Sequence, residues 1–522
     1  MEDHHHYYDH CYLGLALVLS LLLVAIAGRR HRHGLRLAPG PLQLPIIGSL
    51  HHIVWRGWRL PHRALRDLAR RHGSDVMLLR IGEVPTLVLS SREAALEVMR
   101  TQDAAFASRP MSPTNRAMTN AGRDIMFMPY GDQLRHIRKI LIAELLSMRR
   151  VLSFRRVREQ AVAAMLREVA AMARSSSGPP IDMRPRLSAL LSDLTVCAVI
   201  GGRWKERELF LQQIDNLNRI TVGYNLVDLW PSSRLARRLS SALRRTEESR
   251  DIIFRILDGI INEHLERMDS GGGTETTGEA EDILDVLLKM QRDGEISIDM
   301  DIIKVIIFEL FGAGSETTAT VLEWAMAELI RNPRVMQRAT AEVRSVFNGH
   351  NTVPEQALGE LRYLHLVIRE TFRLHPPAPF LPRQAPQGTT NKPCRVLGYD
   401  VPPGTTVLVN IWALGRDARY WPGGDPEAFR PERFEDGGVV DFKGTDFEFL
   451  PFGAGRRMCP GMAFGLAKFE LTLANLLFHF DWEAPGLVDP DNFDMSEVFG
   501  VSVRRKAGLL LRPILRRPVP GV

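Results

Sequence analysis

The chain has 522 residues, of which 45% are hydrophobic and 25% are charged, so it is a globular protein rather than a disordered one. Its four cysteines are too few and too scattered for a disulfide framework, and no CxxC pair predicts a zinc site. The formal net charge of +6 indicates a membrane-facing surface or an acidic partner rather than nucleic acid, for which the sequence contains no recognisable binding module.

The N-terminal segment predicts a membrane anchor. Residues 11–28 form an apolar run without a charge, and its length just reaches the roughly 17–25 residues that a spanning helix needs. Residues 1–10 contain no Lys or Arg, whereas four arginines follow the run: Arg29, Arg30, Arg32 and Arg36. The positive-inside rule therefore predicts a lumenal tail over 1–10 and an uncleaved signal anchor over 11–28, with the rest of the chain in the cytosol. Residues 29–48 are basic and proline-rich and predict a stiff hinge before a catalytic domain over 49–522.

The pattern beyond the hinge predicts a mainly α fold with a minor β region, in one domain. Residues 81–90 alternate and turn like a short hairpin, and most segments after residue 91 have the 3.6-residue periodicity of amphipathic helices. Residues 269–281 are rich in Gly, Thr and Glu and predict a surface loop. Residues 397–408 contain Pro402-Pro403-Gly404, a turn between two short strands.

A long helix is predicted over residues 301–331, with small residues at its middle. Ala313 and Gly314 leave room for a ligand against the helix, and the Thr317 hydroxyl can bond the Ala313 carbonyl and loosen the helix locally. Glu316 places a carboxylate beside that hydroxyl, so the groove has the parts of a proton relay. Taken alone, the run also fits an ordinary buried helix with a Ser/Thr cluster.

A lone cysteine, Cys459, lies in the Gly-rich run of residues 451–461 and directly precedes an apolar helix predicted over 462–480. A thiolate held at a helix N-terminus has a lowered pKa and can ligate a soft metal. An isolated cysteine is more often a small buried hydrophobic residue, so the neighbouring residues decide between the two interpretations.

Those neighbours resemble the haem-binding signature of the cytochrome P-450 superfamily, Phe-x-x-Gly-x-Arg-x-Cys-x-Gly, at every fixed position: Phe452, Gly455, Arg457, Cys459 and Gly461. The resemblance implies haem b with Cys459 as the axial iron ligand and Phe452 beside the cofactor. The run around Glu316 and Thr317 is similar to the family motif for proton delivery during dioxygen activation, which makes these two the candidate catalytic residues. The similarity covers the whole chain and is greatest to plant microsomal members of the seventy-one clan.

The same resemblance identifies a structural triad. Glu370 and Arg373 lie three residues apart on a helix predicted over 361–374, and Arg433 follows in a Pro-Glu-Arg-Phe run. In the family these three positions form a buried ion-pair network, and we expect it to fix the core beside the haem rather than to take part in the chemistry.

Arginines are implied as anchors of the haem carboxylates, because the guanidinium fork matches a carboxylate. The family pattern assigns this role to Arg138, Arg383 and Arg457. Leu134 stands where the family usually has Trp, so one such bond is lost or comes from another group such as His136. Three further basic residues could form a docking face for an acidic redox partner: Arg135, Lys139 and Arg456. The alternative, that they are ordinary solvated surface charges, fits the sequence equally well.

By family analogy an apolar substrate pocket is lined by six residues: Phe127, Phe308, Ala313, Phe380, Leu381 and Phe499. Glu309 interrupts the apolar stretch of the long helix without an evident reason.

The implied function is a monooxygenase of the endoplasmic reticulum membrane that inserts one atom of dioxygen into a small hydrophobic plant metabolite. A terpenoid of defence metabolism is the expected substrate. Electrons would come from NADPH through cytochrome P-450 reductase, with cytochrome b5 as a second donor, because the chain has no flavin or nicotinamide motif. The alternatives are an oxygen-independent isomerase or dehydratase on the same fold, and a non-catalytic haem-binding protein.

Overall fold

The computed structural model describes residues 35–54, 60–173, 179–202, 204–222, 225–270, 281–296, 298–387, 394–436 and 440–521. The expected lumenal tail, the expected anchor, the first part of the hinge and most of the loop at 269–281 lie outside these residues, and those predictions stay predictions.

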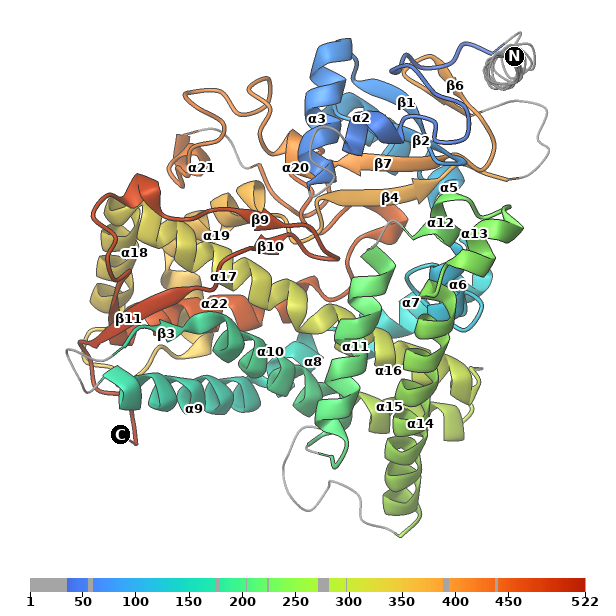
Figure 1. The fold of residues 1–522 in the computed structure, drawn as a ribbon. Coiled ribbons are helices and arrows are strands. Elements are labelled where there is room, and N and C mark those ends of the chain that lie inside the picture. The colour runs from blue at the N-terminus through green and yellow to red at the C-terminus, as the bar shows by residue number, and fades with distance from the viewer. Residues whose placement is uncertain are drawn as a thin grey trace, which may run out of the picture.

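Helices make up most of the molecule and fill its lower and left parts in Figure 1. Their bounds are α2 Leu50–Val54, α3 Pro61–His72, α4 Arg92–Leu96, α5 Asp103–Phe106, α6 Pro113–Met118, α7 Asp132–Ile140, α8 Met148–Ser153, α9 Arg155–Ala173, α10 Met183–Ile200, α11 Arg207–Val222, α12 Leu226–Leu229, α13 Arg234–Leu239, α14 Ala242–Asp269, α15 Ile283–Arg292, α16 Met300–Gly314, α17 Glu316–Arg331, α18 Pro333–Val346, α19 Arg362–Leu374, α20 Ile411–Leu414, α21 Arg433–Asp436 and α22 Met462–His479.

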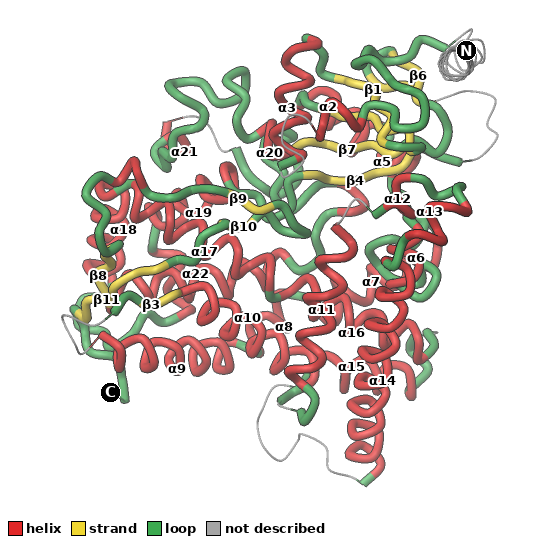
Figure 2. Tube along the Cα trace, in the orientation of Figure 1, coloured by secondary structure: helices red, strands yellow, loops and turns green. Residues whose placement is uncertain are grey.

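The strands are short and lie mostly at the edges of the helical body, as Figure 2 shows in yellow. Their bounds are β1 Val76–Ile81, β2 Val84–Leu89, β3 Ile181–Asp182, β4 Phe380–Gln384, β5 Cys394–Val396, β6 Tyr399–Val401, β7 Thr406–Asn410, β8 Phe480–Glu483, β9 Glu497–Val498, β10 Arg504–Arg505 and β11 Leu510–Leu515. The largest sheet has the order β1-β2-β7-β4, and only β2 and β7 are parallel in it. The mainly α architecture with a minor β region is thereby confirmed.

The predicted hairpin is present but longer than expected. β1 and β2 pair over Val76–Ile81 and Val84–Leu89, with Gly82 at positive φ in the turn. The sequence pattern missed the first strand because β1 is buried at five of its six positions and therefore does not alternate. The predicted turn at Pro402-Pro403-Gly404 does lie between two strands, β6 and β7, which belong to different sheets.

The long helix predicted over 301–331 is divided into α16 and α17 at Ser315. α10 packs against both halves, and α17 also contacts α18, α19 and α22. The combined segment Met300–Arg331 is long and apolar enough to cross a membrane, but more than half of its most apolar window is buried inside the protein. It is therefore the central helix of the fold, and it carries residues of the candidate site.

Candidate active site

The cysteine loop places Cys459 at the entrance of α22. The Cys459 amide donates to the Phe452 carbonyl at 2.8 Å, and this bond closes the loop. Gly455 has φ +63°, and a Cβ atom there would lie 2.5 Å from the Met99 carbonyl oxygen. Only glycine fits this close approach, which fixes the direction in which Cys459 faces.

Cys459 lines a cavity bounded by α10, α16, α17 and α22. The wall is mainly apolar, and next to the cysteine it includes Ala313, Gly314, Thr317, Thr318 and Phe464. Phe452 lines the same cavity and packs its ring 5.0 Å from that of Phe372. Cys459 is exposed in this cavity, which is partly open to the surroundings.

The expectation of a lowered cysteine pKa is wrong for the protein without a bound metal. Burial raises the pKa of Cys459, and the Gly461 amide and the charges of Arg109 and Arg138 only partly oppose it. The local sequence shows that Cys459 precedes a helix, which lowers the pKa of a thiol, but not how deeply the thiol is buried. Here the effect of burial on the pKa is larger than that of the helix terminus. A bound metal ion deprotonates a coordinating thiol outright, so ligation is still possible.

The central helix breaks beside the cysteine. The Thr317 hydroxyl donates to the Ala313 carbonyl at 2.8 Å, which is the bond predicted from the sequence. Glu316 does not line the cavity; its carboxylate accepts a 2.8 Å hydrogen bond from Asn218 of α11. Burial raises the pKa of Glu316. The hydroxyl and the carboxylate of the predicted relay thus lie on different sides of α17.

The structure brings the predicted triad together in the core. Arg373 donates to both Glu370 oxygens at 2.6 and 2.7 Å, and Arg433 donates to Glu370 at 2.9 Å. Glu370 and Arg373 are fully buried, and the Arg430 amide adds a bond to the same carboxylate at 2.7 Å. We call Glu370, Arg373 and Arg433 the paired triad.

Four other arginines gather on the Cys459 side without a carboxylate partner, and we call them the cysteine-side arginines: Arg109, Arg138, Arg383 and Arg457. None of them forms an ion pair within the part of the chain that the structure describes. Burial and the repulsion of Arg109 and Arg457 lower the pKa of Arg383 to about 9. The Nε atoms of Arg109 and Arg383 are buried without a hydrogen-bond partner among the described residues.

The cysteine-side arginines differ in how many hydrogen bonds their guanidinium groups donate to described residues. Arg457 donates to the carbonyls of Ala107, Ile125 and Met128. Arg138 donates to the Met458 carbonyl at 2.8 Å, and Arg383 to Pro382 at 2.9 Å and to Ala454 at 3.4 Å. Arg109 donates to no other described residue. The sequence pattern missed Arg109, since it lies outside the recognised motifs and reaches the site only through folding.

His136 is not the substitute for the missing indole at position 134. Leu134 is fully buried on the inner face of α7, whereas His136 is exposed on its outer face. Arg109 is a donor that the fold brings near Cys459, and its Nε has no hydrogen-bond partner among the described residues.

Glu309 now has a structural explanation. Its carboxylate accepts the amides of Ile125 and Met126, both at 2.8 Å, and so binds the loop after α6 to the central helix. Burial and the neighbouring Asp124 raise the pKa of Glu309 to about 8. Because Arg457 holds the carbonyls of the same loop, its conformation is fixed from two sides.

The residues predicted for the substrate pocket are dispersed. Ala313 lines the cavity of Cys459, but Phe127, Phe308, Phe380, Leu381 and Phe499 are not among its lining residues. Phe308 belongs to the core between α10, α14 and α16, and Phe380 lies 6.3 Å from Phe499. Their role toward a substrate stays a prediction.

A buried lysine, which the sequence did not single out, also lines the cavity. Lys468 Nζ donates to Thr195 Oγ1 at 2.9 Å and to the Gly314 carbonyl at 3.3 Å, next to the helix break. Burial and the charge of Arg158 lower the pKa of Lys468 to about 7.

The expected basic docking face is partly neutralised. Arg135 pairs with Asp132, and Arg456 pairs with Asp103 at 3.0 Å and donates to the Tyr130 hydroxyl. Lys139 is exposed and has no ion pair with a described residue.

Comparison with known proteins decides the family. The family model for cytochrome P450 matches residues 38–512. The chain belongs to the cytochrome P450 family. This P450 is 44% identical to zealexin A1 synthase of Zea mays over 96% of each chain. It is 45% identical to dolabradiene monooxygenase of Zea mays, over 92% of this chain and 93% of the relative. A zebra fish cytochrome P450 solved with progesterone superimposes with a TM-score of 0.70 at 27% identity, over 87% of this chain and 99% of that one.

The family makes this protein a haem-thiolate oxidoreductase that incorporates oxygen, as predicted. The residues fit the cofactor. The cavity contains the thiol and an apolar wall for the macrocycle. Arg383 and Arg457 are buried, and Arg109 and Arg138 are half-buried. The carboxylates of Glu309 and Asp124 only partly offset the charges of Arg109 and Arg457. The two carboxylates of a haem would suit the remaining positive charge.

Proposed function

We propose that this P450 oxygenates a terpenoid and that the cavity of Cys459 holds the haem. The observation that supports it most directly is the mainly apolar cavity at the cysteine, enclosed by the broken central helix. Relatives with similarity over nearly the whole chain include premnaspirodiene oxygenase of Hyoscyamus muticus, at 42% identity. The names of these relatives support the choice of a terpenoid as substrate.

Haem bound in this cavity supplies the oxygen-activating chemistry, which a thiolate ligand promotes. Cys459 is the axial ligand in this proposal. Arg109, Arg138 and Arg383 hold the haem carboxylates, and Arg457 contributes the donor capacity that the loop carbonyls leave free. Phe452 packs against the cofactor from the cysteine loop.

Thr317 is the residue that we assign to proton delivery inside the cavity. Its hydroxyl is held by the Ala313 carbonyl, so its oxygen can accept a hydrogen bond from a proton donor on the cavity side. Glu316, the neighbouring residue, faces Asn218, and burial raises the pKa of its carboxyl.

The electron donor in this proposal is NADPH–cytochrome P-450 reductase of the endoplasmic reticulum, with cytochrome b5 as a second donor. The apolar run at residues 11–28 followed by arginines supports a single-pass anchor with the catalytic domain in the cytosol.

The first experiment is the carbon monoxide difference spectrum of the reduced, membrane-expressed protein, with Cys459→Ala as the control. A Soret band typical of thiolate ligation that is absent in the variant supports the assignment of Cys459. A band typical of a neutral ligand in the wild type contradicts it.

Oxygen-18 then tests the reaction itself. The protein is incubated with a plant reductase, NADPH and a panel of terpene hydrocarbons under labelled dioxygen. Product that carries one labelled atom supports oxygenation, whereas unlabelled product formed without NADPH identifies an isomerase or dehydratase. A panel in which only phenols react contradicts the terpenoid assignment.

A further inference from the structure

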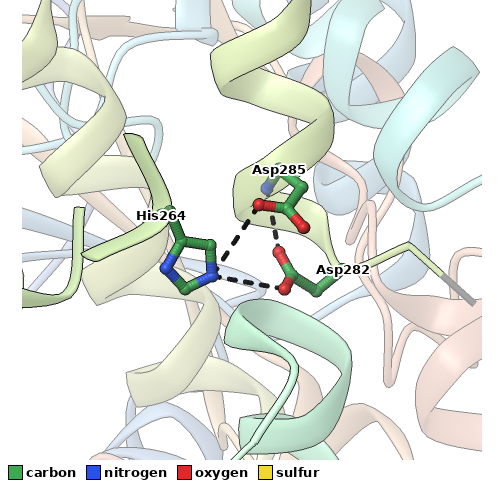
Figure 3. Close-up of side chains that lie close together, drawn as sticks. All are labelled: His264, Asp282 and Asp285. Carbon is green, nitrogen blue, oxygen red and sulfur yellow. Dashed lines mark hydrogen bonds and ion pairs between the residues drawn. The ribbon is translucent and has the colours of Figure 1, made fainter. Parts of the chain in front are cut away.

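Away from the cavity of Cys459, three side chains that commonly bind metal ions meet in the interior: His264 of α14, and Asp282 and Asp285 at the start of α15 (Figure 3). His264 Nε2 lies 3.3 Å from Asp282 Oδ2 and 3.9 Å from Asp285 Oδ1. The possible ligand atoms all lie within 4.8 Å of one another, and all three residues are buried.

The hydrogen bonds around the cluster orient each residue toward its centre. His264 Nδ1 lies 2.8 Å from the Ile260 carbonyl oxygen, so it carries the proton and donates there, and Nε2 faces the two carboxylates. Asp282 Oδ1 accepts the Asp285 amide at 2.8 Å as the N-cap of α15, which leaves Oδ2 directed at the imidazole. A histidine whose second nitrogen donates to a carbonyl is typical of metal ligands.

Asp285 is the residue of the cluster whose carboxylate lacks, within the described chain, a hydrogen-bond donor at one of its oxygens. Its side chain is only 9% exposed, and Oδ1 accepts no hydrogen bond from any residue that the structure describes. Arg267 approaches it to 3.7 Å but is half exposed to solvent. A protonated His264 has one Nε2 proton and can direct it at one oxygen only, and Asp282 is nearer. A cation between the three atoms would contact all of them.

We propose that His264 Nε2, Asp282 Oδ2 and Asp285 Oδ1 bind a divalent zinc ion. Ligands about 2.1 Å from a tetrahedral ion are about 3.4 Å apart, which is close to the separations of Nε2 from the two oxygens. One imidazole and two carboxylates are a ligand set that zinc accepts, and the fourth position remains for water.

The surroundings favour a cation as well. α10 ends at Gly201, and a Cβ atom there would lie 2.6 Å from Asp282 Oδ2, so the C-terminus of α10 borders the cluster. A helix C-terminus carries partial negative charge and stabilises cations. The negative end of α10 therefore offsets the positive N-terminus of α15, which begins at the same cluster, and the two carboxylates supply the net negative charge.

The ion would be structural, and the proposal does not depend on the proposed oxygenation. It would join α14 to the start of α15, where Ile283, next to Asp282, lines the cavity of Cys459. Zinc should therefore stabilise one wall of the haem cavity without taking part in the reaction.

The test uses the full-length holoenzyme in detergent, treated with a chelator and then titrated with zinc chloride by calorimetry, with zinc content measured after gel filtration. We expect the wild type to retain one zinc ion more than Asp285→Asn, which keeps the shape of the side chain but removes its charge. The affinity of the variant for that ion should be at least about tenfold weaker. The histidines at positions 4–6 contribute equally to both proteins.

His365→Gln is the matched control, because His365 lies 3.8 Å from a single carboxylate, that of Glu470, in a partly exposed pair. It should bind zinc as the wild type does. Equal zinc content and affinity in the wild type and Asp285→Asn would overturn the proposal and leave an imidazolium ion pair. If the variant does not fold, thermal unfolding of the wild type, followed at the Soret band, tests the proposal instead. A midpoint temperature that zinc does not raise and chelator does not lower would also overturn the proposal.

Discussion

Two groups of arginines in the interior differ in whether they have a carboxylate partner. In the paired triad, Arg373 and Arg433 share the carboxylate of Glu370, which accepts four hydrogen bonds. The cysteine-side arginines have no ion pair with a described residue, and Arg109 and Arg383 each keep a buried Nε without a partner.

The difference separates arginines that share a buried carboxylate from arginines that form no ion pair with a described residue. A buried charge without a counter-ion is expensive, and Glu370 offsets the charges of Arg373 and Arg433, although Arg433 Nη1 is also buried without a hydrogen-bond partner among the described residues. Burial, and after it the repulsion of neighbouring arginines, lowers the pKa of Arg383 and of Arg457 to about 9. In the proposed haem site, the haem carboxylates would stand toward the second group as Glu370 stands toward the first.

The largest expected effect comes from removing the shared anion. Glu370→Ala leaves two buried guanidinium groups without a counter-ion and should destabilise the fold by about 3–5 kcal/mol. Urea unfolding followed by tryptophan fluorescence measures it. Glu435→Ala, at a surface ion pair with Arg338, is the control and should cost less than about 1 kcal/mol. Normal stability and haem content in Glu370→Ala would mean that the triad does not support the core.

Lys468 extends the comparison to a buried cation that has only neutral partners. Its pKa of about 7 lies below the value of 10.5 that it has in the unfolded chain, so the unfolded chain binds more protons between these values. The free energy of unfolding therefore gains about 1.4 kcal/mol per pH unit from this group as pH rises from about 7 to 10. In Lys468→Met this contribution should be absent.

The measurement is the difference in unfolding free energy between wild type and variant at pH 7, 8, 9 and 10, because other groups titrate equally in both. Lys443→Met, at an exposed position, is the matched control and should follow the wild type. A Lys468→Met profile parallel to that of the wild type would show that the lysine is not destabilised by burial.

Removal of a cysteine-side arginine should weaken haem binding without destabilising the haem-free fold, whereas loss of Glu370 should destabilise the fold. Arg383→Leu removes a buried cation without an anion, so the haem-free chain should be no less stable than the wild type. Haem should be held more weakly by about 10- to 100-fold, since hydrogen bonds to charged groups contribute about 1.5–3 kcal/mol. Transfer of haem to an excess of apomyoglobin measures its retention. Faster unfolding of the haem-free variant with unchanged haem transfer would contradict the assignment.

Sequence predicts those parts of the site that depend on neighbours along the chain. The Thr317–Ala313 bond joins positions four residues apart, and the cysteine loop is a contiguous motif, so both could be predicted. Arg109 could not, because it lies 350 residues before Cys459 and carries no local pattern. Its role follows only from folding, which brings it to the other cysteine-side arginines without a partner.

Burial limits prediction in the same way. The helix terminus at Cys459 predicts a lowered pKa, but the depth of the cavity raises it, and that depth comes from packing between α10, α17 and α22. Phe308 was placed in the pocket by family analogy; in the structure it belongs to the core between helices, and its role toward a substrate stays a prediction. An apolar helix face does not tell which of its residues meet a ligand and which meet another helix.

The smallest expected effect concerns cations on the protein surface, which also differ in whether they have a carboxylate partner. Arg135 and Arg456 already have carboxylate partners, whereas Lys139 is exposed without one, so Lys139 has the freest charge for an acidic reductase. Lys139→Glu should slow reduction of the holoenzyme by the reductase severalfold at low salt, and the difference should vanish at about 0.5 M salt because screening removes long-range attraction. Stopped-flow reduction under carbon monoxide measures the rate. Arg135→Gln is the control and should change the reduction rate less, because Asp132 already compensates the charge of Arg135. Equal slowing in both variants would mean that ion pairing does not determine which cations attract the reductase.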